Sequence, residues 1–278
     1  MAKVPISFEV YPPRSEESAP ALYEAIDRLA ELDPSFISVT FGAGGSETKN
    51  SLEVLGYIKA AGVAPLAHLT CAGTSMETAT ALVREFLDAG INDFLALRGD
   101  LPQGQLELPE ASLRTAADLV RLISEVRTEP GKTAVAAFPN GHPESGENRS
   151  DIAALLAKQA AGADYAITQL FFYATDYLDF VKLARDSGVT IPILPGIMPI
   201  ISPKRLQRVI ELTGERNPED FARALASAVD FGARVEVGIE WAAKLVSELV
   251  EAGVPGVHLY AFNEHERVTE VLRRASLL

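Results

Sequence analysis

Ile6-Ser-Phe-Glu-Val-Tyr11 is an apolar run of strongly β-forming residues, and Pro12-Pro13-Arg14 ends it abruptly. Glu9 lies in the middle of this run. Burying a carboxylate in a core strand costs free energy, and this cost is usually tolerated only at a functional site. Two plainer interpretations stay open at this point: Glu9 faces solvent through strand alternation, or it pairs with Arg14.

Outward from this strand, short β-rich runs alternate with longer amphipathic segments. The predicted strands are Ile6–Tyr11, Phe36–Phe41, Ala64–Thr70, Asp93–Leu97, Thr133–Phe138, Tyr165–Leu170, Ile191–Pro195 and Val257–Ala261. The helix-like stretches between them include Ala19–Glu31, Lys49–Ala61, Met76–Ala89, Ser112–Arg127, Asp151–Ala161 and Asp176–Ser187. This alternation predicts an α/β fold, a (β/α)₈ TIM barrel. A doubly wound open sheet is the alternative, but no Gly-x-Gly-x-x-Gly turn follows the first strand.

The alternation breaks once, between the seventh and eighth predicted strands, where extra helices replace a single crossover. These helices are Ser202–Leu212, Pro218–Phe231 and Val235–Ala252. We expect an insertion rather than a second domain, because no Gly/Ser-rich linker or charge block divides the chain. Residues 1–278 are therefore expected to form a single (β/α)₈ catalytic barrel.

The composition limits the partners of this chain. Lys and Arg number 25 against 38 Asp and Glu, which gives a net charge of −13 and argues against nucleic-acid and anionic-membrane binding. We find no stretch apolar enough for a bilayer span or a signal peptide. The single cysteine, Cys71, excludes an internal disulfide and fits a reducing compartment. We expect a cytoplasmic protein with no nucleic-acid or membrane partner, and a homo-oligomer is compatible with the sequence.

Polar residues collect where the predicted strands end, and this end of a TIM barrel carries the active site. They are Glu9, Thr40, His68, Thr70, Arg98, Asp100, His142, Thr168, Gln169, Tyr260 and Asn263. Together they indicate a polar ligand, although a lone histidine such as His68 is more often a hydrogen-bonded core residue. The four histidines are scattered, so we expect no catalytic metal. No lysine lies inside a predicted strand, which disfavours Schiff-base chemistry.

Seven blocks follow one another along the chain: Phe8-Glu-Val-Tyr-Pro-Pro-Arg14, Ser38-Val-Thr-Phe-Gly-Ala-Gly-Gly45, His68-Leu-Thr-Cys71, Leu95-Ala-Leu-Arg-Gly-Asp-Leu-Pro102, His142-Pro-Glu144, Ile167-Thr-Gln-Leu-Phe-Phe172 and Pro195-Gly-Ile-Met-Pro199. In this order they resemble the methylenetetrahydrofolate reductase family, and seven ordered blocks are far more specific than one. The resemblance implies a (β/α)₈ barrel that reduces 5,10-methylenetetrahydrofolate to 5-methyltetrahydrofolate. NADH or NADPH supplies the electrons in that family, usually through bound FAD.

The resemblance also implies roles for individual residues. Glu9 matches the general acid, which is expected to help protonate N5 of the substrate so that the five-membered ring opens to a 5-iminium cation that accepts hydride. Asp100 matches a catalytic aspartate that contacts the pterin, and Gln169 matches a glutamine on the pterin edge. Thr40 is expected beside both substrate and redox ring. The remaining matches to cofactor positions are His68, Arg98, Gly99, Asp151 and Lys158.

The departures from the family pattern concern mainly the flavin. A Tyr-Ala pair of the flavin-containing members is Thr115-Ala116 here, and the Asn and Arg of their fifth helix are Ala154 and Ala157. Their Tyr-Pro-Glu is Phe138-Pro-Asn140. Their Arg after the last strand is Glu264, and a stacking aromatic residue is Val209. An arginine lost from a pyrophosphate site costs about 1.5–3 kcal/mol. We therefore expect NADH or NADPH to transfer hydride directly, without FAD.

Three alternatives stay open from the sequence. FAD could still bind through substitute contacts, or another reductant such as a deazaflavin or a ferredoxin could serve. A non-catalytic folate-binding barrel is the third, and Glu9 argues against it because binding alone needs no proton donor.

Overall fold

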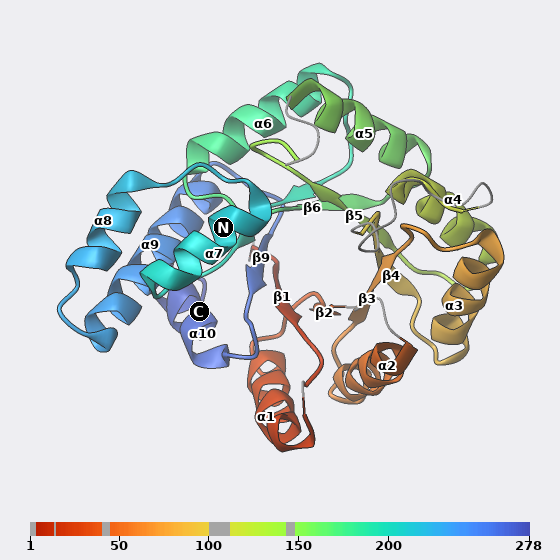
Figure 1. Cartoon of the computed structure of the whole chain (residues 1–278), viewed down its shortest axis with the longest axis horizontal. Coiled ribbons are helices and arrows are strands. Elements are labelled where there is room, and N and C mark those ends of the chain that lie inside the picture. Colours follow the sequence, from red (N-terminus) through yellow and green to blue (C-terminus); the bar gives the residue numbers. More distant parts are fainter. Residues whose placement is uncertain (1–3, 14, 41–44, 100–111, 143–147) are drawn as a thin grey trace.

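The computed structural model describes residues 4–13, 15–40, 45–99, 112–142 and 148–278. In these residues a nine-stranded parallel sheet curves around a central space, and helices surround it (Figure 1). The strands are β1 (Ile6–Val10), β2 (Ile37–Val39), β3 (Pro65–Thr70), β4 (Asp93–Leu97), β5 (Thr133–Ala137), β6 (Tyr165–Thr168), β7 (Ile193–Leu194), β8 (Gly196–Ile197) and β9 (Val257–Tyr260). The helices are η1 (Glu16–Ser18), α1 (Ala19–Ala30), α2 (Gly45–Ala60), α3 (Met76–Asp88), α4 (Ala116–Val126), α5 (Asn148–Ala160), α6 (Ala174–Asp186), α7 (Pro203–Thr213), α8 (Glu219–Ser227), α9 (Phe231–Glu251) and α10 (His265–Arg274).

The predicted TIM barrel is confirmed, with one correction at its seventh strand. The predicted strand Ile191–Pro195 is two short strands, β7 and β8, on either side of Pro195. Proline has no backbone N–H to give to a ladder, so the pairing changes partner at this residue. β7 pairs with β6, and β8 pairs with β9, which itself pairs with β1. The segment around Pro195 therefore links β6 to β9 in the barrel wall, through β7 on one side and β8 on the other.

Alternate residues of the strands face two different cores. Ile6, Phe8 and Val10 of β1 pack in the large cluster between sheet and helices. Residues of the opposite phase on the neighbouring strands form a smaller cluster inside the barrel: Phe36, Leu66, Leu95, Ala134 and Ile167. Because side chains alternate along a strand, Ser7 and Glu9 face the barrel interior. A solvent-facing Glu9 outside the barrel is thereby excluded.

Capping residues explain two helix starts that differ from the predicted ones. α4 begins at Ala116, not at Ser112, because Thr115 and Asp118 form a reciprocal capping box. α9 begins at Phe231, not at Val235, because the Asp230 carboxylate accepts from the Ala233 amide at 2.8 Å. α10 has no counterpart among the predicted helices. Over the described ranges, no helix has the length and apolar character needed to cross a membrane.

The predicted extra helices are confirmed as α7, α8 and α9, which widen the helical ring on the left of Figure 1. They are held by an apolar cluster that joins Leu170 and Phe172 after β6 to Leu206, Val209, Phe221 and Leu225. The Trp241 indole also donates to the Phe172 carbonyl at 3.1 Å. This packing positions the first turn of α7 beside the ends of β8 and β9.

Candidate active site

Two histidines converge on the carboxylate of Glu9 inside the barrel. Glu9 Oε2 lies 3.5 Å from His68 Nε2 and 3.8 Å from His258 Nε2. The Glu9 side chain is 16% exposed, whereas His258 is fully buried. Neither Nε2 atom has a hydrogen-bond partner among the described residues. Buried polar atoms are nearly always satisfied, so two unpartnered imidazole nitrogens that converge on one carboxylate indicate a place for a ligand, a water or a proton.

Ser7 fixes the orientation of His258. The Ser7 hydroxyl can donate to the Val257 carbonyl at 3.3 Å, and its Oγ lies 2.9 Å from His258 Nδ1. In this arrangement His258 Nδ1 carries the proton and donates to Ser7. Nε2 is then an acceptor aimed at Glu9. A carboxyl proton on Glu9 would give this buried nitrogen the donor that it lacks.

His68 is held neutral by its surroundings. Burial lowers the pKa of His68 below its usual 6.5; the charge of Glu9 opposes this shift and His258 adds to it. His68 was predicted to contact the redox ring, and its imidazole in fact also lies against the predicted acid. A neutral imidazole at 3.5 Å orients the carboxyl without forming a strong ion pair with it.

Tyr260 forms the wall next to Glu9, since the two residues are paired across β1 and β9. Burial raises the pKa of Tyr260 well above its usual 10.0, and the charge of Glu9 adds to the rise. The neutral hydroxyl donates to the Thr168 carbonyl at 2.8 Å. Gly196 is needed beneath this bond, because a Cβ there would lie 2.3 Å from the Thr168 carbonyl oxygen and 2.8 Å from the Tyr260 hydroxyl.

Thr40 and Gln169 lie at the ends of β2 and β6, as predicted. The Thr40 amide continues the ladder to the Val10 carbonyl at 3.1 Å, which places Thr40 near the end of β1. The Gln169 side-chain oxygen accepts from the Leu170 amide at 2.9 Å. Its amide nitrogen has no hydrogen bond to any described residue and is available to a ligand acceptor.

The predicted cofactor residues form a second group around β4 and β5. Lys158 donates to the Ala136 carbonyl at 2.8 Å, and burial lowers its pKa to about 8, with Asp151 opposing and Arg98 adding to the shift. Asp151 is buried and accepts from the His142 amide at 2.9 Å. Gly99 has a φ of 78°, and a Cβ there would lie 2.8 Å from Thr70 Cβ. The structure therefore brings Arg98, Asp151 and Lys158 together.

Two features of this mouth bear on the predictions. Asp100 lies outside the described residues, so its position stays a prediction. Glu215, which the sequence did not single out, is buried and accepts from Asn140 Nδ2 at 2.7 Å. Burial raises the pKa of Glu215 to about 7; Asn140 opposes the shift and Asp176 adds to it. This bond joins the loop after β5 to the loop after α7.

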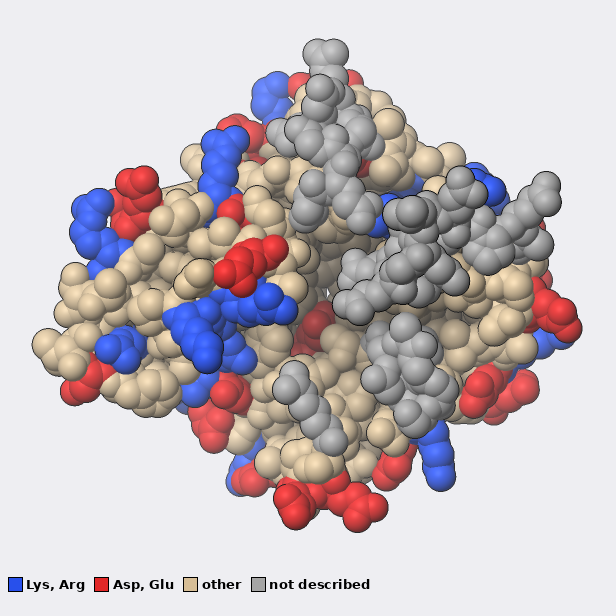
Figure 2. All heavy atoms as spheres, in the orientation of Figure 1, with Lys and Arg blue, Asp and Glu red and all other residues tan. Residues whose placement is uncertain are grey.

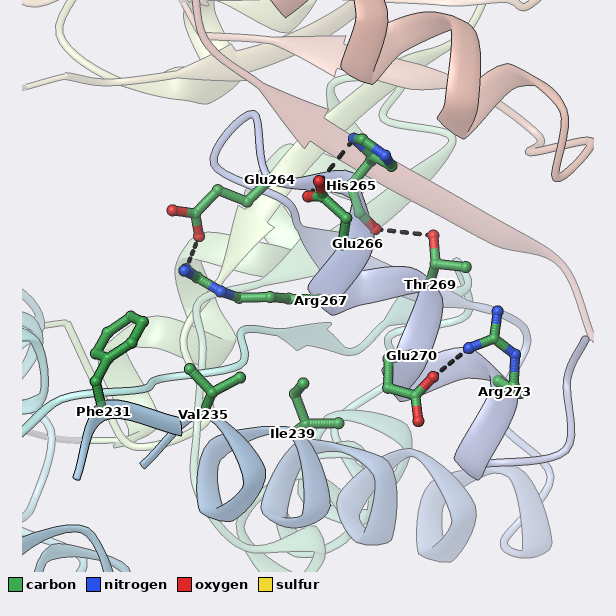
Figure 3. A pocket seen from close by; sticks show the side chains of 10 residues that line it. All are labelled: Phe231, Val235, Ile239, Glu264, His265, Glu266, Arg267, Thr269, Glu270 and Arg273. Atoms are coloured by element: carbon green, nitrogen blue, oxygen red, sulfur yellow. Dashed lines mark hydrogen bonds and ion pairs between the residues drawn. The ribbon is translucent and has the colours of Figure 1, made fainter. Parts of the chain in front are cut away.

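A pocket of about 740 Å³ lies outside the barrel wall, between α9 and α10 (Figure 3). Its lining residues are Phe231, Val235, Ile239, Glu264, His265, Glu266, Arg267, Thr269, Glu270 and Arg273. None of the predicted site residues lines this pocket. Volume alone therefore does not identify the active site here, and the polar group around Glu9 is the better candidate. No set of three His, Cys, Asp or Glu residues suited to a metal occurs in the described part of the chain.

Comparisons with known proteins give the family of this chain. The family model of methylenetetrahydrofolate reductase matches residues 1–276. The 5,10-methylenetetrahydrofolate reductase of Escherichia coli is 35% identical over 266 residues, which cover 95% of this chain and 88% of that protein. Methylenetetrahydrofolate reductase (NADH) 1 of Arabidopsis thaliana is 33% identical over 98% of this chain, which spans about half (48%) of the plant protein.

Among solved structures, the fold is similar to that of an uncharacterized Clostridium thermocellum protein that binds two copies of 5-methyl-5,6,7,8-tetrahydrofolic acid. The TM-score is 0.66 at 16% identity, with 98% of this chain and 94% of that chain covered. At this identity the match concerns the fold alone. The family model and the 35% identity to a reductase of similar length together show that this chain belongs to the methylenetetrahydrofolate reductase family.

Proposed function

We propose that this protein reduces 5,10-methylenetetrahydrofolate to 5-methyltetrahydrofolate, with NADH or NADPH giving its hydride directly to the substrate and Glu9 acting as the general acid. The observation that carries the proposal is the position of Glu9. Its carboxyl lies inside the barrel near the C-terminal end of β1, and two imidazole nitrogens face the same oxygen.

The chemical step needs one proton and one hydride. The proton of Glu9 goes to N10, rather than to N5 as the resemblance implied, as the bond between N10 and the bridging methylene carbon breaks. The lone pair of N5 forms the new double bond to that carbon, which gives the 5-iminium cation. Hydride then leaves C4 of the dihydronicotinamide and adds to the methylene carbon, so the folate gains two electrons and the nicotinamide loses two.

The interior around Glu9 suits this sequence of charges. After the proton has left, the Glu9 carboxylate faces a cation in a site largely shielded from water, where their attraction is stronger than in bulk solvent. Neutral His68 does not compete with that cation for the carboxylate. His258, oriented by Ser7, presents an acceptor to the acid before transfer. We assign Gln169, Asp100 and Thr40 to the pterin, in line with their matches to the family motif.

The residues of the flavin arm support transfer without FAD. Thr115, at the position of a flavin-contacting tyrosine in the resemblance, is engaged in capping α4. Ala154 and Ala157 are exposed on α5 and offer only a methyl group where Asn and Arg would bind the arm. These residues fit the group poorly. The buried Lys158 ammonium is already engaged by the Ala136 carbonyl, so it too is poorly placed to bind the arm.

An isotope experiment tests direct transfer. NADH deuterated at C4 is supplied with 5,10-methylenetetrahydrofolate in ordinary water, and the product methyl group is examined by mass spectrometry. Direct transfer keeps the deuterium in the methyl group. A flavin would hold the hydrogen at an N–H that exchanges with water, so the label would be lost.

The absorption spectrum of the purified protein is the companion measurement. We expect NADH-dependent turnover without a flavin band and without stimulation by added FAD. Flavin bound at one per chain and required for turnover would overturn direct transfer, while reduction itself would stand. Absence of any folate reduction with NADH or NADPH would overturn the proposed activity.

A further inference from the structure

One hydroxyl group in the barrel interior is buried beside Glu9 without a partner. Ser38 is the middle residue of β2 and is fully buried. Its Oγ has no hydrogen bond to any of the described residues. A buried hydroxyl without a bond costs free energy, and each such group in a native protein calls for an explanation.

The β-ladder places Ser38 next to Glu9. The two residues are paired in register across β1 and β2, so their side chains point to the same face of the sheet. Neighbouring strands lie about 4.8 Å apart, a distance that a serine hydroxyl and a glutamate carboxyl can span. β2 also lies between β1 and β3, so the approach of His68 to Glu9 crosses the strand that carries Ser38. Ser38 therefore belongs to the interior group around Glu9.

The other hydroxyl groups at these ladder positions are already engaged. Tyr260, which is paired with Glu9 on its other side, donates to a backbone carbonyl at 2.8 Å. Ser7 can donate to a backbone carbonyl at 3.3 Å. Of these three hydroxyl groups, only that of Ser38 has no acceptor among the described residues. It is the hydroxyl donor that remains available to Glu9.

Glu9 and Ser38 differ in their access to a ligand. Figure 2 shows a hollow at the centre of the view, with acidic side-chain atoms inside it. The Glu9 side chain is 16% exposed, whereas Ser38 has no exposed surface. A ligand that enters from solvent can therefore contact the carboxyl of Glu9 but not the hydroxyl of Ser38. A role of Ser38 in the reaction has to act through Glu9.

We propose that Ser38 is a positioning residue for the acid, whose hydroxyl donates to the Glu9 carboxylate once the proton has passed to the substrate. Before transfer, the carboxyl proton is directed to the acceptor nitrogen of His258. The exchange needs only side-chain rotations of Ser38 and Glu9. The new hydrogen bond offsets part of the cost of leaving a charge in the interior. This inference rests on the proposed function, because it takes Glu9 as the general acid.

The test compares Ser38→Ala with the wild type in single-turnover reduction of 5,10-methylenetetrahydrofolate by NADH across a range of pH. Loss of a hydrogen bond to a charged group should lower the rate roughly tenfold, with the affinity for folate unchanged. Ionisation of the acid is also less favoured without this donor, so the alkaline limb of the pH profile should move up by about one unit. The titratable groups that face Glu9 are His68 on β3 and His258 and Tyr260 on β9, and all three are kept in this variant.

Thermal stability separates this role from a structural one. Ser38→Ala replaces an unpartnered hydroxyl with a methyl group, so its melting temperature should equal or exceed that of the wild type. Ser38→Cys keeps a weak donor of similar shape and should recover only part of the rate. A lower melting temperature together with an unchanged pH profile would make Ser38 a structural residue and overturn the proposal.

A double variant tests whether Ser38 acts through Glu9. No carboxylate forms at position 9 in Glu9→Gln, so adding Ser38→Ala to this variant should lower the remaining rate by less than about twofold. A tenfold loss on adding Ser38→Ala in both backgrounds would show that Ser38 acts independently of the acid, and the proposal would be wrong.

Ser247→Ala is the matched control. Ser247 is a partly buried serine of α9, outside the barrel wall, and its hydroxyl donates to the Ala243 carbonyl at 3.0 Å. Its rate and pH profile should equal those of the wild type. If the wild type reduces folate and Ser38→Ala keeps the same rate and pH profile, only this inference fails. If the wild type reduces no folate, or Glu9→Gln is fully active, the proposed function fails and this inference fails with it.

Discussion

The two sides of the barrel mouth differ in whether their polar atoms already have partners within the protein. Around Glu9, the Nε2 atoms of His68 and His258 and the hydroxyl of Ser38 are buried without a hydrogen bond to the described residues. Around Lys158 the corresponding groups are engaged. Its ammonium donates to the Ala136 carbonyl, and Asp151 accepts from the His142 amide.

This difference separates a prepared site from one that has become structural. Unsatisfied buried groups cost about 1–3 kcal/mol each, so a protein keeps them only where a ligand or a proton satisfies them during function. The Glu9 side has this character. The β4–β5 side uses its polar groups internally, as the bonds of Lys158 and Asp151 show.

The largest expected effect is at the acid itself. Glu9→Gln removes the proton donor but keeps a planar group of the same size, so folate binding should persist while reduction falls by roughly 10²–10⁴-fold. Steady-state turnover and folate titration of the same preparation measure the two quantities. Glu31→Gln is the control and should keep full activity, because Glu31 is an exposed carboxylate at the C-terminal end of α1. A Gln variant within tenfold of the wild type would remove Glu9 from the mechanism.

The next largest effect is on stability and concerns the close packing of β8 beside Tyr260. A Cβ at position 196 would press on the Thr168 carbonyl and on the Tyr260 ring, so Gly196→Ala should destabilise the protein by about 1–3 kcal/mol. Gly56→Ala is the control, because this exposed glycine inside α2 has open space at its Cβ. That variant should gain up to about 1 kcal/mol. Thermal unfolding measures both, and equal melting temperatures would show that Tyr260 is not held against Gly196.

His258→Asn tests the orientation of the acid. The Asn amide can still donate to Ser7 Oγ, as His258 Nδ1 does, but it leaves no acceptor facing Glu9. We expect kcat to fall by about tenfold, the worth of one hydrogen bond to an ionisable group, with little change in KM. The pH profile of kcat should also move, because the surroundings of the acid change. An unchanged profile with a lower melting temperature would make His258 a structural residue only.

How much of this could be read from the sequence depends on the range of the contacts. The barrel could be predicted because it rests on local patterns, the strand runs and the helical spacing. Glu9 could be singled out because it is a carboxylate inside an apolar strand. His258 and Ser7 were not placed beside Glu9, because that requires the register between β1 and β9, some 250 residues apart in the chain. A break at Pro195 could be predicted, since proline interrupts a ladder of hydrogen bonds. The sequence did not predict that the two halves pair with different strands, β6 and β9.

The Asn140–Glu215 bond was also beyond a reading of the sequence. It joins two loops whose paths are set by the packing of α7 and α8 on Leu170 and Phe172, not by their own residues. Thr115 shows the reverse case. Its Thr-x-x-Asp pattern is a local capping signal that was present in the sequence, yet the comparison with the family drew attention to a lost flavin contact instead.

The smallest expected effect sharpens the comparison from the β4–β5 side. The pKa of Lys158 is about 8 in the folded protein against a usual 10.5, so between these values the unfolded chain binds more protons. Stability conferred by this position should therefore rise as the pH increases from 8 toward 10.5. The difference in unfolding free energy between wild type and Lys158→Met, measured by urea denaturation across this window, should move in favour of the wild type. Lys59→Met is the matched variant, because Lys59 also donates to a backbone carbonyl, that of Gly90, but from an exposed position. A difference for Lys158 that does not change across this window would mean that its ammonium is solvated, and the β4–β5 side would then resemble an open ligand site more than a structural one.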